Sequence, residues 1–317
     1  MIKPIAQRDA LLRRIHENML TDKSIFFVSA DFGSPVLDDI RADFPDRFLN
    51  VGIAEQNLIN VSAGLALEGF TVFAYAIAPF ITMRCFEQLR VNLALLSEVR
   101  EMNVNLIGVG AGYSYVVSGP THQCYEDLSL VRSLPNFRIF SPSDHLTAAN
   151  LFHACVQLTG PKYLRLDAQV LPPLREDCSP ALGKTGFDVL RDGAEIVIAA
   201  TGFMTHTALA VAEMLMVNGV DVKVIDIVSL TDFDAEAFLG CVDGRRHLFS
   251  LEEGFEGRGG VDALMRHLLT NRGNMMPFTG IGVAPEYKFE LGSRAELHEM
   301  VGIGVNAVQD RILTTLG

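Results

Sequence analysis

Short runs of continuously apolar residues alternate along this chain with longer segments of helical periodicity. A strand that is apolar throughout has both faces buried, which is typical of a parallel sheet covered by helices on both sides. We therefore expect an α/β fold with a mostly parallel sheet. In the first half the expected strands are 24–29, 48–51, 71–77, 104–109, 137–140 and 162–166, and the expected helices are 9–22, 55–66, 83–97 and 146–157.

Three prolines and several charges interrupt the alternation at residues 171–183, a composition typical of a linker. The alternation then resumes. The sequence therefore predicts two successive domains, residues 1–172 and 184–317, joined by a linker at 173–183. Each domain is long enough for a hydrophobic core of its own. In the second half the expected strands are 196–200, 222–226 and 248–251, and the expected helices are 205–217 and 295–301.

Composition narrows the class of function. A formal net charge of −12 disfavours nucleic acid and anionic membrane surfaces as partners. The longest apolar stretch, residues 70–81, is too short to span a bilayer, and we expect no signal peptide. The five cysteines are odd in number and show no CxxC spacing, so we expect reduced thiols and a cytoplasmic protein. No histidine spacing indicates a metal site.

A single carboxylate stands in an almost uncharged stretch, Gly52-Ile53-Ala54-Glu55-Gln56-Asn57. The apolar run before it and the helical periodicity after it place Glu55 at a strand-to-helix turn. The plain explanation is a helix-start glutamate near the positive end of the helix dipole. The alternative explanation is a buried, desolvated carboxyl that takes part in a reaction.

A second polar string, Ser118-Gly119-Pro120-Thr121-His122-Gln123, presents a histidine on a loop. A neutral imidazole both donates and accepts hydrogen bonds, which suits proton transfer. In this order the two strings resemble the transketolase family and its relative deoxyxylulose-phosphate synthase. The resemblance continues through residues 76–84, 201–204, 251–260 and 289–293. It implies a pyrimidine-binding domain followed by a transketolase C-terminal domain.

The resemblance also implies a site for thiamine diphosphate. Glu55 matches the catalytic glutamate that hydrogen-bonds a ring nitrogen of the cofactor's aminopyrimidine. Phe80 matches an aromatic residue that packs on that ring. Asp31 matches an aspartate near the cofactor, for which a helix cap is the alternative explanation. Arg84 borders the same expected site.

Other family positions bear on the substrate. His122 matches a catalytic histidine that contacts the hydroxyl or carbonyl oxygen of the donor sugar. Ser118 replaces an aspartate that contacts a donor hydroxyl, and Gly110 stands where a histidine helps to hold the substrate phosphate. Arg165 matches an arginine that can grip a phosphate bidentately. These departures imply a donor with a different hydroxyl pattern or anionic end.

Two further patterns have simpler explanations. The glycine-rich run 108–112 mimics a dinucleotide-binding loop, but it lacks the third glycine's spacing and the later acidic partner of such loops. Glu252 and Glu253 could pass for paired catalytic carboxylates. Because adjacent strand residues point to opposite faces, we expect a structural or interface role for both.

The family's diphosphate-and-metal-binding segment, a Gly-Asp-Gly followed by asparagines, has no counterpart in this sequence. In the family the pyrimidine and the diphosphate lie on different domains. We therefore expect a separate diphosphate-binding partner subunit, which would hold the cofactor's Mg²⁺ or Ca²⁺ and form an α2β2 assembly with this chain. The chain alone is expected to be inactive.

The sequence thus predicts the C-terminal subunit of a split, thiamine diphosphate-dependent transketolase. Such an enzyme transfers a two-carbon ketol unit from a ketose, here an unusual or modified sugar or sugar phosphate, to an aldehyde. Two alternatives stay open at this point. One is a 2-oxo acid dehydrogenase beta subunit of the same size and architecture, and the other is a non-catalytic assembly subunit, degenerate at Ser118 and Gly110.

Overall fold

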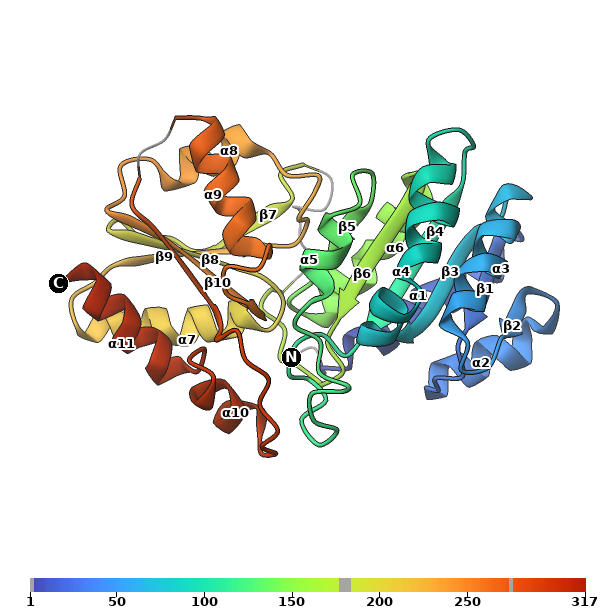
Figure 1. Ribbon diagram of the computed structural model, residues 1–317, viewed down its shortest axis with the longest axis horizontal. Coiled ribbons are helices and arrows are strands. Elements are labelled where there is room, and N and C mark those ends of the chain that lie inside the picture. The colour runs from blue at the N-terminus through green and yellow to red at the C-terminus, as the bar shows by residue number, and fades with distance from the viewer. Residues whose placement is uncertain (1–2, 177–183, 274–275) are drawn as a thin grey trace. The chain divides into compact units, whose positions relative to one another are not determined.

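The computed structural model describes residues 3–176, 184–273 and 276–317 (Figure 1). These residues fold as two compact units. The N-terminal unit takes its described residues from 1–111, 130–140 and 144–179, and the C-terminal unit takes its own from 112–129, 141–143 and 180–317. Two short segments from the first half of the sequence, 112–129 and 141–143, thus pack as part of the C-terminal unit. Of the linker expected at 173–183, residues 177–183 lie outside the described residues.

The sheet of the N-terminal unit has six parallel strands: β1 (Ile25–Ser29), β2 (Phe48–Asn50), β3 (Thr71–Ile77), β4 (Asn103–Val109), β5 (Arg138–Phe140) and β6 (Gly160–Leu166). Their order is β2-β1-β3-β4-β6-β5, and every neighbouring pair is parallel. The residues inside the central strands β3 and β4 are buried, as expected for a sheet covered on both faces. The expected parallel α/β fold is therefore confirmed.

Helices cover this sheet in two groups (Figure 1). Helix α1 (Gln7–Met19) packs against α2 (Pro35–Asp43) and α6 (His145–Gln157), whereas α3 (Glu55–Leu67) packs against β3 and the helical segments that follow it. Each group buries its apolar stripe against the sheet. Two other short helices are η1 (Pro45–Arg47) and α5 (Asp127–Arg132), and the first three residues of α5 belong to the C-terminal unit.

The segment after β3 is not the regular helix expected over 83–97. It starts earlier and consists of two π-helical stretches, η2 (Phe80–Arg84) and η3 (Leu89–Leu95), around the short α4 (Phe86–Gln88). Side chains compete here for backbone carbonyls: Thr82 Oγ1 donates to the Ala78 carbonyl at 2.7 Å, and Cys85 Sγ donates to the Ile81 carbonyl at 2.8 Å. π-Helical turns of this kind occur often at functional sites.

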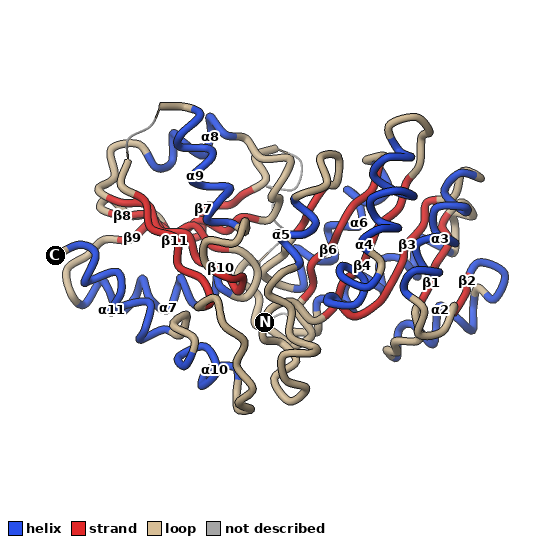
Figure 2. The backbone as a smooth tube through the Cα atoms, viewed as in Figure 1, coloured by secondary structure: helices blue, strands red, loops and turns tan. Residues whose placement is uncertain are grey.

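The sheet of the C-terminal unit has five strands: β7 (Phe187–Arg191), β8 (Ile196–Ala200), β9 (Val222–Ile227), β10 (His247–Phe255) and β11 (Phe278–Val283). The order is β11-β10-β8-β9-β7, and the strands are parallel except for β7, which runs antiparallel to β9 at the edge. Figure 2 shows the strands of this unit in red and its helices in blue. The sequence predicts β8, β9 and β10 but not the two edge strands.

Five helices are described in this unit: α7 (Met204–Val217), α8 (Ala235–Val242), α9 (Val261–Asn271), α10 (Arg294–Met300) and α11 (Val305–Leu316). Helices α7 and α11 pack together, and α9 packs on β10 and β11. The core between them includes Ile198, Phe249 and Leu251, which are completely buried. None of the described helices is long and apolar enough to cross a bilayer.

A buried ion group attaches α10 to β10. Glu253, 1% exposed, accepts hydrogen bonds from Arg294 Nε and Nη2 at 2.7–3.0 Å and from His298 Nε2 at 2.7 Å. Glu252 makes a different contact, because its Oε1 accepts the backbone N–H of Asp262 at 3.0 Å. The adjacent glutamates thus hold different parts of the unit, in keeping with the structural role expected for them.

The Glu253 ion group predicts an acid-dependent loss of stability. Burial alone would raise the pKa of Glu253, but Arg294 and His298 outweigh it and hold the pKa well below its ordinary value of 4.5. Because the folded-state pKa is lowered, the contribution of Glu253 is complete above pH 4.5 and is lost as the pH falls toward the folded-state pKa. We expect Glu253→Gln to lower the free energy of unfolding by about 3–5 kcal/mol at pH 7, since it leaves Arg294 uncompensated.

The measurement is urea unfolding of the wild type and of Glu253→Gln between pH 7 and pH 3. The difference between the two proteins should shrink below pH 4.5, since the wild type then loses a contribution that the variant never had. A difference that stays constant over this range would show that the Glu253 charge does not stabilise the fold.

Candidate active site

Glu55 is the first residue of α3, and its side chain is buried with 4% exposure. The chain turns from β2 into this helix at Gly52, whose φ of +76° is a conformation that residues with a Cβ disfavour. The partial positive charge of the helix N-terminus favours a carboxylate at this position. Glu55 therefore does start a helix, as the plain explanation has it. The hydrogen-bond partner of its carboxylate, however, lies outside α3.

Arg84 connects Glu55 with Phe80. Its Nη1 donates to the two Glu55 oxygens at 3.0 and 3.1 Å, and its Cζ lies 3.8 Å from the centroid of the Phe80 ring. The Glu55 side chain is 5% exposed, whereas that of Arg84 is 46% exposed. Three residues that the sequence assigns to a cofactor site thus form one contact group, on α3 and on the π-helical segment η2.

A cavity of about 590 Å³ opens beside this group. Such a volume is within the range usual for sites that bind small molecules or cofactors. Its polar lining includes one buried carboxylate, one guanidinium and three side-chain amides. The lining residues are Ile53, Ala54, Glu55, Gln56, Asn57, Asn60 and Arg84.

Asp31 follows β1 and is held by a residue that sequence reasoning does not single out, Asn50. The Asn50 amide donates to Asp31 Oδ1 at 2.9 Å, and its oxygen accepts the backbone N–H groups of Asp31 and Gly52 at 3.1 and 2.9 Å. Asp31 has a φ of 51°, which short polar side chains tolerate. The N-cap of α2 is Ser34, so Asp31 does not cap that helix. A polar residue at the end of a strand, two residues before the glutamate string, was the available signal for Asn50.

Cys85 is a second residue near Glu55 that sequence reasoning does not assign. It is fully buried, and its thiol donates to a backbone carbonyl. Burial raises the pKa of Cys85 to about 12, and the negative charge of Glu55 adds to this rise. The thiol is therefore neutral at physiological pH and acts as a structural group, not as a nucleophile.

Gly110 and Arg165 also lie in the N-terminal unit. Gly110 follows β4 with a φ of 105°, and its N–H donates to the carbonyl of Leu166 at 2.9 Å. Arg165 lies in β6 opposite Gly108 of β4 and is only 2% exposed. An arginine buried to this extent needs a compensating polar environment, so it is a candidate for holding an anionic group only where that group also enters the interior.

Ser118 and His122 lie on a loop of the C-terminal unit, residues 112–124, which we name the His122 loop. Its ends are joined by reciprocal backbone hydrogen bonds between Gly112 and Cys124, both 3.0 Å. A turn within it, closed by the His122 N–H on the Gly119 carbonyl at 3.1 Å, presents the imidazole, and Ser118 is exposed. The Thr121 hydroxyl lies 3.0 Å from His122 Nδ1, which orients the ring.

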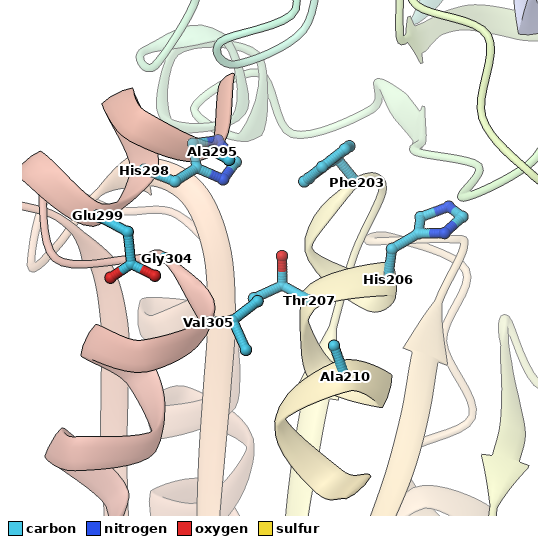
Figure 3. Close-up of a pocket in the computed structure, with 9 residues that line it drawn as sticks. All are labelled: Phe203, His206, Thr207, Ala210, Ala295, His298, Glu299, Gly304 and Val305. Atoms are coloured by element: carbon cyan, nitrogen blue, oxygen red, sulfur yellow. The ribbon is translucent and has the colours of Figure 1, made fainter. Parts of the chain in front are cut away.

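A second cavity, of about 220 Å³, lies within the C-terminal unit and was not expected from the sequence (Figure 3). It lies between α7, which contributes His206 and Thr207, and α10, which contributes His298 and Glu299. Its lining is mostly apolar. None of the residues assigned from the sequence to cofactor or substrate lies in this cavity.

Comparison with known proteins gives the family of this chain. The family model described as transketolase, pyrimidine binding domain, matches residues 3–173, and the one described as transketolase, C-terminal domain, matches residues 186–308. These matches cover most of the chain. The chain belongs to the transketolase family.

Relatives of similar length carry more specific names. The chain is 30% identical to the B subunit of the apulose-4-phosphate transketolase of Actinobacillus succinogenes, over 86% of each chain. It is 31% identical to the protein of the same name from Phocaeicola vulgatus, over 89% of this chain and 88% of the relative. A solved split-gene transketolase, described as an inactive β4 tetramer, has a TM-score of 0.84 at 28% identity and covers 98% of both chains.

The contact between Glu55 and Arg84 can be measured by a double-mutant cycle. Arg84→Met keeps an apolar stem on Phe80 but removes the charge. We expect it to lower the free energy of unfolding by about 1–3 kcal/mol, because the buried Glu55 oxygens lose their donor. The double variant with Glu55→Gln completes the cycle. The coupling energy between Glu55 and Arg84 should be about 1 kcal/mol, because solvent screens the half-exposed guanidinium.

The matched control is Arg90→Met. Arg90 is exposed on the same irregular segment, and its nearest carboxylate, that of Glu87, lies 3.8 Å away. This change should alter the free energy of unfolding by no more than about 0.5 kcal/mol. Equal effects of Arg84→Met and Arg90→Met in denaturant unfolding would contradict an energetic role for the Glu55–Arg84 pair.

Proposed function

We propose that this chain is the C-terminal subunit of a split transketolase that uses thiamine diphosphate to transfer a two-carbon ketol unit from a ketose to an aldehyde. The observation that carries this proposal is the buried Glu55 carboxylate, which opens on a cavity of about 590 Å³ beside Phe80 and Arg84. The names of the relatives, transketolase subunits of similar length, support it.

The residues of the cavity fit the aminopyrimidine part of the cofactor. A planar, nitrogen-rich ring needs an aromatic surface and hydrogen-bonding groups. The Glu55 carboxyl and the side-chain amides that line the cavity offer the hydrogen-bonding groups, and Phe80, which packs on the Arg84 guanidinium, would offer the aromatic surface. Glu55 would hold a ring nitrogen, Phe80 would pack on the ring, and Arg84 and Asp31 would border it. When bound, the cofactor supplies the electron sink that the cleavage of a ketose beside its carbonyl requires.

The His122 imidazole is the group of this chain that would contact the donor sugar. Thr121 orients the ring through its Nδ1, and the imidazole would contact a hydroxyl or carbonyl oxygen of the substrate. Ser118, on the same loop, would contact a donor hydroxyl without adding charge. Arg165 would hold an anionic end, and Gly110 stands where the family has a histidine.

The donor is best sought among unusual sugars. Replacing a carboxylate by the Ser118 hydroxyl and an imidazole by Gly110 removes two groups that the family uses for ordinary ketose phosphates. The two relatives described above are named for apulose 4-phosphate, itself an uncommon sugar. We infer an unusual or modified ketose, or its phosphate, as the donor of this enzyme.

A partner subunit completes the proposed enzyme. It would bind the diphosphate of the cofactor together with Mg²⁺ or Ca²⁺ and form an α2β2 assembly with this chain. The related split-gene chain, solved as an inactive β4 tetramer, supports both self-association and a lack of activity without the partner.

The four cysteines that the structure describes are free thiols, in keeping with a cytoplasmic location.

Glu55→Gln tests the catalytic proposal. In the complex with the diphosphate-binding partner we expect the kcat for ketol transfer to fall by about 10²–10⁴, because the amide cannot exchange a proton with the cofactor's ring. The control is Glu68→Gln, the same change at the exposed opposite end of α3, which should leave the kcat unchanged. Turnover is measured in the complex isolated by a tag on this chain.

Two results would contradict the proposal. One is unchanged turnover of Glu55→Gln. The other is a tagged chain that always purifies as a cofactor-free homo-oligomer without a partner, which would favour the assembly-subunit alternative.

Ser118→Asp tests how the loop reads the donor. Restoring the carboxylate should shift the ratio of kcat/KM values toward ordinary ketose phosphates by about tenfold, because it regains a charged acceptor for a donor hydroxyl. Val117→Asp, which adds the same charge at the neighbouring exposed residue, is the matched control. If both variants give the same substrate profile in a panel of ketoses, position 118 does not contact the donor.

A further inference from the structure

The base of the His122 loop is attached to the buried ion group of β10 and α10. The backbone N–H of Tyr113, the second residue of the loop, donates to Glu253 Oε1 at 3.1 Å. The same oxygen accepts hydrogen bonds from Arg294 and from His298. One carboxylate oxygen therefore joins the start of the loop to α10, within the C-terminal unit.

Gly112 makes this attachment possible. Its φ is +54°, and a Cβ built on it would lie 2.3 Å from Cδ and Oε2 of Glu253. Such a distance is far below van der Waals contact, and the carboxylate is 1% exposed and held by Arg294, so it has no room to withdraw. The loop backbone can approach Glu253 this closely only at a glycine.

Aromatic packing fixes the loop around the same point. The Tyr113 ring meets the His298 ring edge to face, with centroids 5.5 Å apart, and lies 4.9 Å from the ring of Tyr125, which follows the loop directly. Burial raises the pKa of Tyr113 to about 12, so its phenol stays neutral. Both ends of the loop are thus packed against side chains of the C-terminal unit.

We propose that Glu253 is a positioning residue for ketol transfer: by fixing the base of the His122 loop, it sets the place of the His122 imidazole. This inference rests on the proposed function, because it takes His122 as the group that contacts the donor. It gives the C-terminal domain a role in the reaction that is distinct from subunit association. Glu253 itself touches neither cofactor nor substrate and acts through the backbone of Gly112 and Tyr113.

Gly112→Ala tests this role without removing any charge, and Gly219→Ala is its matched control. Gly219 follows α7 with a φ of +80° and has no atom within 4 Å of a built Cβ. Both variants place alanine at a positive φ, but only the first pushes the loop away from Glu253. We expect the Tyr113 amide to exchange hydrogen at least about tenfold faster in Gly112→Ala and at the wild-type rate in Gly219→Ala.

In the complex with the partner, Gly112→Ala should lower kcat/KM for the donor by about tenfold or more relative to Gly219→Ala, because small displacements of a catalytic group are costly. The dissociation constant for thiamine diphosphate should stay within about twofold, since Glu55 and Phe80 lie in the other unit. His298→Asn, which removes one donor from the same Glu253 oxygen, should act in the same direction and serves if Gly112→Ala does not fold.

The outcomes separate the two proposals. Equal donor kcat/KM for Gly112→Ala and Gly219→Ala would overturn the positioning role, as would an equal loss of cofactor and donor binding. If the wild-type complex transfers no ketol unit, this result contradicts both the proposed function and the positioning role that rests on it. Hydrogen exchange at Tyr113 then still decides whether Glu253 anchors the loop.

Discussion

Two buried glutamates organise this protein, because a carboxylate taken out of water must be compensated by a cation and by hydrogen bonds. In the N-terminal unit the cation beside Glu55 is Arg84, whose side chain is 46% exposed. In the C-terminal unit the cation beside Glu253 is Arg294, whose side chain is 5% exposed. The first pair borders a cavity, so solvent or a ligand can replace the guanidinium. The second pair is closed on all sides and suits permanent attachment.

The parallel sheet explains why the residues around Glu55 meet. Strands β2, β1 and β3 are neighbours in the N-terminal unit, and Glu55, Asp31 and Phe80 come after these strands, respectively. The carboxyl ends of parallel strands meet at one edge of the sheet, where ligands of open α/β folds bind. The π-helical start of the next segment then brings Arg84 over Phe80 and toward Glu55. The strand order thus brings Glu55, Asp31 and Phe80 to one edge of the sheet, and the π-helical backbone places the Arg84 guanidinium beside them.

The parts of this fold that could be predicted are those with local signals. Continuous apolar runs identified the central strands, and β3 has the bounds expected from the sequence. The edge strands β7 and β11 were not predicted, because β7 is half-exposed and β11 contains two glycines. Glu55 stood out because it is the single charged residue of an almost uncharged stretch. The contact between Glu55 and Arg84 could not be predicted, because it depends on π-helical turns. These turns arise from hydrogen bonds of the Thr82 and Cys85 side chains.

The division of the chain into units could not be predicted from sequence order either. Residues 112–129 follow β4 of the first sheet, yet they pack as part of the C-terminal unit, and the signal for this is a non-local contact of the Tyr113 N–H with Glu253. The compact units of the structure therefore do not follow sequence order at this segment. Having both domains on one chain makes the contact between the His122 loop and Glu253 intramolecular, so that its formation does not depend on protein concentration. In the proposed enzyme the diphosphate-binding domain comes from a separate chain, whereas Glu253, which holds the base of the His122 loop, lies on the same chain as the loop.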